Sequence, residues 1–271
     1  MQFHVSNVID VILHGFSYDK RQHRRFLGRV GNGHTGLGCF NLFFIPLLFP
    51  RATSDSSKMT TQILLLKNAT DAQIEQAVEL SMRAYEGDES VVSMIGGDET
   101  LRIHMFRAMI RAGAREGAFY AVTDTMSGII LSFSIWFAPG RRIFDTEAQR
   151  SLDWTDFVNA LQPKVQEWWV NVLGPLHHEA MVKYVGPEYP DSWYASIIAT
   201  DPEYQRRGYA SSLVSTVLQR GTKEGKPVLL ATQTMGNAKW YQSLGFELKG
   251  KTTIPSDYFK FPDYILRWAS C

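Results

Sequence analysis

The stretch DPEYQRRGYASSLV, residues 201–214, combines a proline-marked turn, two arginines and small residues that lead into an apolar run. The first amides of a helix have no partners within that helix and carry partial positive charge, so an anion can satisfy them. Gly208 and Ala210 are small enough to allow close approach to the backbone, and Arg206 and Arg207 add full positive charge. The stretch therefore favours binding of a diphosphate at the start of a helix.

The same residues exclude two other kinds of phosphate-binding loop. Residues 201–214 contain neither the GxxxxGK[ST] pattern of nucleoside triphosphate loops nor the GxGxxG fingerprint of dinucleotide-binding folds. A charged helix start that binds no ligand is the structural alternative. The spacing within this one stretch does not decide between the two.

The segments on either side indicate a strand–helix–strand unit. WYASIIA, residues 193–199, is a strand candidate, and apolar residues then recur at helical spacing up to Gly221. PVLLA, residues 227–231, is the next strand. This unit is the one parallel crossover that short connections dictate.

The rest of the body completes a mixed α/β pattern. Residues 118–124 and 129–137 surround a short turn and predict an antiparallel hairpin whose second strand is covered on both faces. Thr70 begins a capping-box pattern ahead of a helix, and residues 85–99 are expected to be a loop. Further strands are predicted at 63–67, 246–253 and 263–269, and further helices at 99–114 and 237–244. The predicted fold is a mixed central sheet with helices on both faces.

Residues 141–176 interrupt the strand pattern and predict one or two helices. Their large apolar side chains are Trp154, Phe157, Leu161, Trp168 and Trp169. We expect most of these side chains to pack in the core, and one or two to line a substrate pocket.

The loop resembles the pyrophosphate-binding loop of the GCN5-related N-acetyltransferase (GNAT) superfamily, whose pattern is Q/R-x-x-G-x-G/A. Gln205, Gly208 and Ala210 match that pattern, after a strand and before a helix. GNAKWYQSLGFEL, residues 236–248, is similar to the late helix of the family, N-x-x-x-Y-x-x-x-G-F. The matching residues there are Asn237, Tyr241, Gly245 and Phe246. Two motifs in the family's order are far more specific than either motif alone.

This resemblance covers roughly residues 60–270 and is strongest to fungal and bacterial small-molecule acetyltransferases, including the antibiotic-modifying type. It implies the GNAT fold, with residues 141–176 as a helical insertion, and acetyl-CoA as the acetyl donor to an amine. The positions that would contact acetyl-CoA are Ile198, Ala199 and Thr200 on the strand, Gln205, Arg206, Arg207, Gly208, Tyr209, Ala210 and Ser211 in the loop, and Asn237.

The same resemblance places Tyr241 near the thiol sulfur, as the acid that protonates the leaving thiolate. A hydroxyl within about 3 Å of the sulfur is able to do this, and a tyrosine packs its ring while its hydroxyl stays polar. Without the resemblance, an ordinary half-buried tyrosine beside Trp240 is the preferred interpretation.

The general base is not determined by the sequence. The strand at 193–200 offers serine and threonine but no carboxylate. Upstream candidates are Glu179, Glu188, Asp191, His177 and His178. A histidine has a suitable intrinsic pKa, although this pair is expected on a solvated helix. An ordered water chain is an equal alternative.

Composition limits the class of protein. The net charge of +1 argues against a large nucleic-acid footprint. Cys39 and Cys271 cannot build a disulfide framework or a zinc site, so we expect no metal and an intracellular, most simply cytoplasmic, location. The apolar run at 39–50 is broken by Pro46 and is shorter than the roughly 20 residues that span a bilayer, so no membrane association is expected.

The chain is expected to consist of a leader, residues 1–58, and one domain, residues 59–271. The leader is rich in arginine and glycine, and Met59 begins a segment that resembles a natural start. A disordered or non-native extension and a mitochondrial presequence both remain open.

Three functions remain open for the domain. The first is an N-acetyltransferase that acts on a small-molecule amine. The second is acetylation of a protein N-terminus or lysine. The third is a non-catalytic acyl-CoA-binding module, which the missing strand carboxylate keeps open.

Overall fold

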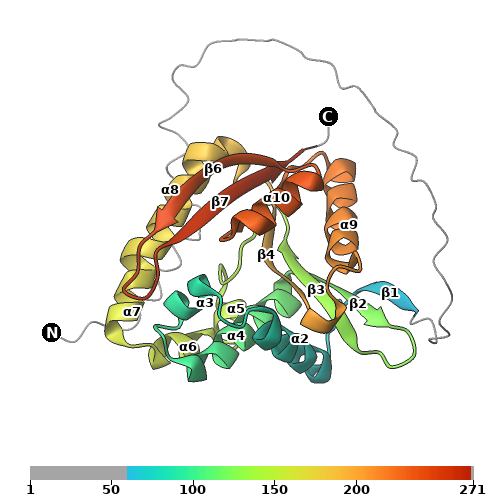
Figure 1. The fold of residues 1–271 in the computed structure, drawn as a ribbon, viewed down its shortest axis with the longest axis horizontal. Coiled ribbons are helices and arrows are strands. Elements are labelled where there is room, and N and C mark those ends of the chain that lie inside the picture. Colours follow the sequence, from blue (N-terminus) through green and yellow to red (C-terminus); the bar gives the residue numbers. More distant parts are fainter. Residues whose placement is uncertain (1–59, 270–271) are drawn as a thin grey trace, which may run out of the picture.

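The computed structural model describes residues 60–269, and the leader predicted at 1–58 lies outside them. Within the described residues, seven strands form one sheet in the order β1-β2-β3-β4-β5-β7-β6 (Figure 1). The strands are β1 Thr61–Leu65, β2 Ala118–Asp124, β3 Ile130–Phe137, β4 Trp193–Thr200, β5 Val228–Thr232, β6 Glu247–Ile254 and β7 Phe261–Trp268. The α-helices are α2 Asp71–Ala84, α3 Glu89–Met94, α4 Arg102–Glu116, α5 Glu147–Arg150, α6 Trp154–Ala160, α7 Pro163–Trp168, α8 Gly174–Tyr184, α9 Tyr209–Glu224 and α10 Met235–Ser243.

The parallel contact between β4 and β5 is short. All other neighbouring strands pair antiparallel, and the β2–β3 hairpin is confirmed. β4 and β5 pair only at Trp193 with Val228 and at Tyr194 with Leu229. Beyond these two pairs the strands diverge, so the sheet contains a gap beside the second half of β4. The predicted parallel crossover and mixed sheet are confirmed.

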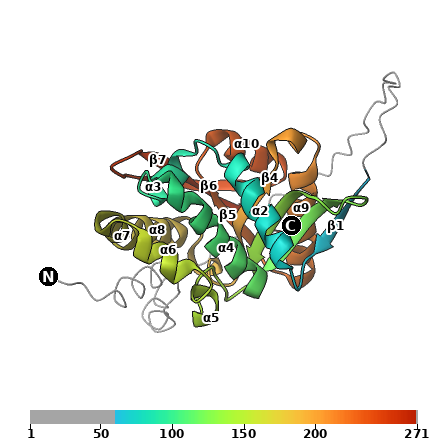
Figure 2. The ribbon, with the colours of Figure 1, turned by 90° about the horizontal axis from the view of Figure 1, so that it is seen from below.

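Helices cover both faces of the sheet because side chains alternate along the strands. On β2, Phe119 and Ala121 pack in the core that contains α2 and α4, whereas Tyr120 and Val122 pack in the core that contains α9 and α10. α8 lies along β6 and β7 (Figures 1 and 2). Every residue of β3 is buried, as its continuous apolar sequence predicts.

The N-terminal cap of α2 confirms the capping box at Thr70. Its hydroxyl accepts from the Gln73 amide, and the Gln73 side chain accepts from the Thr70 amide at 2.9 Å. The expected loop at 85–99 is wrong in one part, because α3 forms there. Asp88 caps α3 by accepting from the Ser90 and Val91 amides.

The region after β3 contains more helices than the one or two expected. α5 and α6 are short, and α7, a π-helical turn at Trp169–Leu173 and α8 then run on to Tyr184. Trp154 is fully buried and stacks on Phe144 with 3.9 Å between ring centroids. Aromatic packing thus anchors a series of short helices that sequence periodicity does not separate. Within residues 60–269, none of the helices has the length and apolar character needed to span a membrane.

Candidate active site

The loop between β4 and α9 has a row of unpaired amides. The backbone N–H groups of residues 205–211 donate no hydrogen bond to any described residue. The first amide with a helical partner is that of Ser212, which donates to the Gly208 carbonyl. Arg206 and Gly208 both have left-handed backbones, with φ of 63° and 84°. Alternation of this kind turns successive amides toward one side and creates an anion-binding concavity.

Gly208 has a backbone conformation that favours glycine. A Cβ built at this position meets no atom within 4 Å, so the space beside it is open. Its φ of 84°, however, is one that residues with a side chain adopt at a cost. The prediction that a small residue here lets an anion approach the backbone stays a prediction, and the positive φ adds a conformational reason for glycine.

A groove of about 560 Å³ lies beside these amides, and we call it the loop groove. Nearly all of the residues predicted to contact a cofactor line it: Ile198, Ala199, Thr200, Gln205, Arg206, Gly208, Tyr209, Ala210, Ser211 and Asn237. Arg207 does not line it. Its guanidinium lies 5.1 Å from the Tyr204 ring centroid and donates to the Glu203 carbonyl, which leaves Arg206 as the loop arginine at the groove.

The second half of β4 forms one wall of the loop groove. Its residues pair with β3 on one side, and the gap toward β5 leaves the other side open. Three carbonyls of this strand accept side-chain hydrogen bonds: Ile198 from the Tyr85 hydroxyl at 3.0 Å, Ala199 from the Ser132 hydroxyl at 3.0 Å and Thr200 from Gln205 Nε2 at 3.3 Å. An extended ligand in the gap would lie alongside an exposed strand edge.

Asn237 and Tyr241 are four residues apart on α10 and therefore share one face of that helix. Thr234 caps α10 by accepting from the Asn237 amide at 3.1 Å. Tyr241 is 8% exposed, and within the described residues its hydroxyl makes no hydrogen bond. Burial, together with the nearby Tyr85, raises the pKa of Tyr241, so the phenol keeps its proton.

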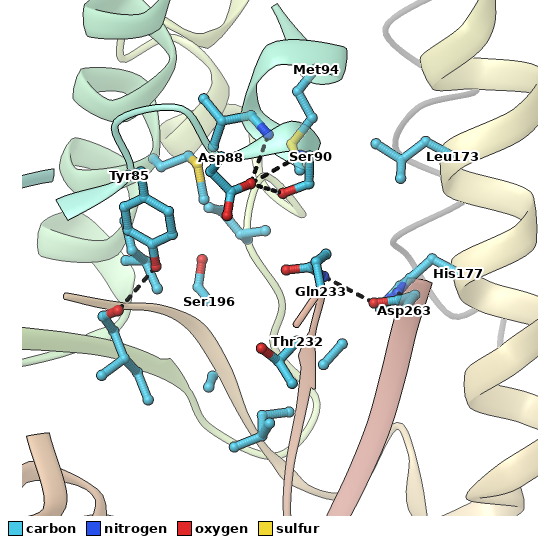
Figure 3. Close-up of a pocket in the computed structure, with 18 of the residues that line it drawn as sticks. Tyr85, Asp88, Ser90, Met94, Leu173, His177, Ser196, Thr232, Gln233 and Asp263 are labelled. Carbon is cyan, nitrogen blue, oxygen red and sulfur yellow. Dashed lines mark hydrogen bonds and ion pairs between the residues drawn. The ribbon is translucent and has the colours of Figure 1, made fainter. Parts of the chain in front are cut away.

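A second cavity, of about 240 Å³, adjoins the groove, and we call it the inner cavity (Figure 3). Both spaces are lined by Tyr85, Asp88, Ile198, Asn237 and Tyr241, which mark their junction. Away from the junction the wall of the inner cavity combines large apolar side chains with polar ones such as Arg142, His177 and Asp263. Its large side chains are Met94, Met105, Phe106, Met109, Phe144, Trp154, Trp169, Leu173 and Phe261. Trp154 and Trp169 are the members of the 141–176 aromatic set that line it.

Asp88 is a carboxylate at the junction that sequence reasoning missed. Its Oδ1 accepts from the Ser90 amide at 3.0 Å and from the Val91 amide at 3.1 Å. Its Oδ2 makes no hydrogen bond within residues 60–269, and Figure 3 shows the side chain directed into the pocket. The signal available beforehand was the N-cap pattern of an aspartate just ahead of a short apolar segment.

His177 is buried, contrary to the expectation of a solvated helix. It is 9% exposed, lines the inner cavity, and its Nδ1 lies 2.7 Å from Asp263 Oδ2. Asp263, another residue that sequence reasoning missed, comes from β7 and is 2% exposed. α8 packs on β7, and this tertiary contact brings together residues 86 positions apart.

The remaining candidate bases lie outside both cavities. Glu188 pairs with Arg267, Asp191 pairs with Lys226, and Glu179 is exposed. His178 contacts the Tyr189 ring, and burial lowers its pKa. Across residues 60–269, no three His, Cys, Asp or Glu side chains gather in a way that could hold a metal ion.

The comparison with known families bears on the same segment. The family described as acetyltransferase (GNAT) domain matches residues 172–248, which include β4, the loop, α9, β5 and α10. Residues 172–248 are therefore similar to the acetyltransferase (GNAT) domain family. Tyr241 lies within the matched segment, and so do most of the residues that line the loop groove.

Proteins similar to this chain in sequence or in structure include acetyltransferases. An uncharacterised N-acetyltransferase of Schizosaccharomyces pombe is 23% identical over 167 residues, which cover 61% of this chain and 65% of that protein. A mosquito arylalkylamine N-acetyltransferase-like protein has a TM-score of 0.56 at 14% identity, with 78% of this chain and all of that chain covered. A Corynebacterium glutamicum structure described as a histone acetyltransferase HPA2 and related acetyltransferase has a TM-score of 0.53 at 20% identity. The match covers 79% of this chain and 98% of that chain. At these identities the structural likeness concerns the GNAT fold alone.

Proposed function

We propose that this GNAT domain transfers the acetyl group of acetyl-CoA to the amine of a small molecule by direct attack. The observation that carries the proposal is the meeting of two spaces at Tyr241 and Asp88. One space has unpaired backbone amides suited to a diphosphate, and the other is a partly apolar cavity suited to a small acceptor.

Acetyl-CoA would bind in the loop groove through the backbone. The amides of residues 206–211 would hold the diphosphate, with Arg206 adding positive charge at the groove. The pantetheine arm would lie in the gap beside Ile198, Ala199 and Thr200, in the position of a further strand, with Asn237 contacting it. Because acetyl-CoA is an intracellular metabolite, this activity requires an intracellular compartment.

In this reaction Asp88 acts as the base and Tyr241 as the acid. Asp88 takes a proton from the substrate ammonium, and the free amine attacks the thioester carbonyl carbon. A C–N bond forms, the C–S bond breaks, and Tyr241 donates its proton to the departing sulfur. The nitrogen then gives up its second proton, which restores the phenol. Positioned proton transfers of this kind accelerate such reactions by about 10²–10⁴-fold.

The size and walls of the inner cavity favour a small acceptor over a protein. A volume of about 240 Å³ accommodates a short chain or a single ring, and α6 and the π-helical turn line it with the aromatic side chains of Trp154 and Trp169. Asp88 also supplies the carboxylate that the β4 strand lacks, which removes the main reason to favour a non-catalytic acyl-CoA-binding module.

Thiol release provides the test. The full chain is incubated with acetyl-CoA and a panel of primary amines, a peptide with a free N-terminus and a lysine peptide, and free CoA is measured with a thiol reagent. We expect release with small amines that carry an apolar body. Release only with the peptides would favour a protein acetyltransferase, and CoA binding without any release would favour a binding module.

A further inference from the structure

Four side chains, from β7, α8, β4 and the loop after β5, form a continuous hydrogen-bonded chain beside the inner cavity. Asp263 Oδ2 lies 2.7 Å from His177 Nδ1, and His177 Nε2 lies 3.0 Å from the Tyr194 hydroxyl. The other oxygen of the same carboxylate, Asp263 Oδ1, accepts from Gln233 Nε2 at 3.0 Å. All four residues line the inner cavity.

With an ionised Asp263 and a neutral His177, the donors and acceptors in this chain have one consistent assignment. An ionised carboxylate accepts and does not donate, so His177 Nδ1 carries a proton and donates it to Asp263. In the neutral imidazole His177 Nε2 is then an acceptor for the Tyr194 hydroxyl. Burial raises the pKa of Tyr194 well above its usual range, so this hydroxyl keeps the proton that it donates.

The same logic determines which way the Gln233 amide points. Its NH₂ group must face Asp263, because the carboxylate has no proton to offer the amide oxygen. The amide oxygen, Oε1, therefore faces away from Asp263. Figure 3 shows it directed into the pocket, on the side where Asp88 and Ser196 lie. Gln233 is held there as a hydrogen-bond acceptor that has no partner among the described residues.

Two acceptors, Asp88 Oδ2 and Gln233 Oε1, thus face one small space. We propose that Gln233 is a specificity-determining residue that accepts an N–H of the substrate, and that Asp263 and His177 are positioning residues for it. The inference rests on the proposed function and specifies its substrate class, an ammonium group with at least two N–H groups on an apolar body.

A primary ammonium has the hydrogens that this arrangement needs. One N–H can go to Asp88, which removes that proton, and another can go to Gln233. With one N–H held by Gln233, the nitrogen lone pair created by deprotonation has a defined direction. An alcohol has a single hydrogen and leaves one of the two acceptors without a partner, and an acceptor that loses water without gaining a partner weakens binding. A tertiary ammonium also has a single N–H, so it too leaves one of the two acceptors without a partner.

The test uses 2-phenylethylamine and its alcohol analogue 2-phenylethanol as probes, on the full chain with CoA bound. Gln233→Met keeps the length of the side chain and removes the amide. Gln242→Met is the matched control, because Gln242 is exposed on α10 and lines neither space. Asp263→Asn tests positioning, because an asparagine can offer its NH₂ to Gln233 Oε1 and so release the amide orientation. Calorimetry gives each dissociation constant, and thermal melts verify folding.

We expect Gln233→Met to weaken amine binding by about ten- to a hundredfold and to raise KM for the amine more than it lowers kcat. CoA affinity should stay within about twofold, and the preference for amine over alcohol should shrink in both Gln233→Met and Asp263→Asn. A purely structural role of the chain would lower melting temperature and leave that preference unchanged.

The outcomes separate this inference from the proposed function. If the unmodified chain acetylates amines, and Gln233→Met behaves like Gln242→Met, the inference is wrong and the function stands. If no amine causes thiol release, the function fails, and calorimetry still decides the inference: weaker amine binding by Gln233→Met sustains it. Absence of amine binding by the unmodified chain overturns it, and an unchanged amine-over-alcohol preference in a folded Asp263→Asn removes the positioning role.

Discussion

The loop groove and the inner cavity are built in different ways. The groove presents the unpaired backbone amides of the loop, and its central part comes from one segment, residues 198–211. The inner cavity presents side chains from α3, α4, the helical region after β3, and strands β4, β5 and β7. Recognition of a constant group, a diphosphate, needs only a local backbone shape, whereas recognition of a particular acceptor needs side chains that only tertiary packing brings together. The groove should therefore be sensitive to backbone changes and the cavity to side-chain chemistry.

The largest effect is expected in the groove, from Gly208→Glu. The substitution imposes a side chain on a left-handed backbone and brings a negative charge to the diphosphate site, so CoA affinity should fall by at least about a hundredfold. Calorimetric titration with CoA measures it. Gly225→Glu is the matched control, because Gly225 has φ of 63°, open space around it, and lies at the far end of the same helix. Equal CoA affinity in the two variants would refute the diphosphate assignment.

Tyr241→Phe tests the boundary between the two regions. Loss of the proton donor should lower kcat by about 10²–10³-fold, while CoA affinity changes little because the ring is retained. Steady-state thiol release and CoA titration give both values. Tyr184→Phe is the control, since its hydroxyl contacts the Lys251 carbonyl and it lines neither space. Unchanged turnover in Tyr241→Phe would exclude Tyr241 as the acid.

Asp88→Asn probes the carboxylate at the junction. Asparagine is also a good N-cap, so α3 should persist while the negative charge is lost, and kcat/KM should fall by about 10–10²-fold with unchanged CoA affinity. Asp98→Asn provides the comparison, because the Asp98 carboxylate also caps a short helical turn by accepting from the Thr100 amide. A similar small effect in both variants would assign Asp88 to capping alone.

The smallest effect concerns alkaline pH. A neutral phenol has an ordinary pKa of about 10, and burial raises the pKa of Tyr241 further because it disfavours the phenolate. The proton that Tyr241 donates is thus present below pH 10, and kcat should not decline between pH 8 and pH 10. A pH profile of kcat at saturating substrates tests this. A decline in that window that disappears in Tyr241→Phe would show an unshifted or lowered phenol pKa.

Features that depend on neighbouring residues in the chain were predicted better than features that depend on tertiary contacts. The capping box at Thr70, the fully buried β3 and the parallel β4–β5 contact were predictable because each depends on residues close together in the chain. The contact of the Arg207 guanidinium with the Tyr204 ring was not predictable, because the loop motif does not show which neighbour this side chain meets. The roles proposed for Tyr241 and for the loop amides stay predictions until they are measured.

Residues of the inner cavity were harder to predict for a physical reason. Asp263 lies in the strand sequence FPDYILRW, and nothing in that sequence indicates a function for a single aspartate. Its role follows only from the contacts with His177 and Gln233, which come from distant parts of the chain. His177 sits on a helix of mixed composition, and whether that helix face is solvated depends on the sheet that it meets.

The amino-acid sequence by itself determined the order of the elements, the mixed sheet and the unpaired amides of the loop, because these depend on local periodicity, on glycine conformation and on helix ends. Tertiary structure alone decided which side chains share the inner cavity, which face of α8 is buried and which way the Gln233 amide points. These features arise from contacts between residues as many as 86 positions apart, and no local pattern encodes such contacts.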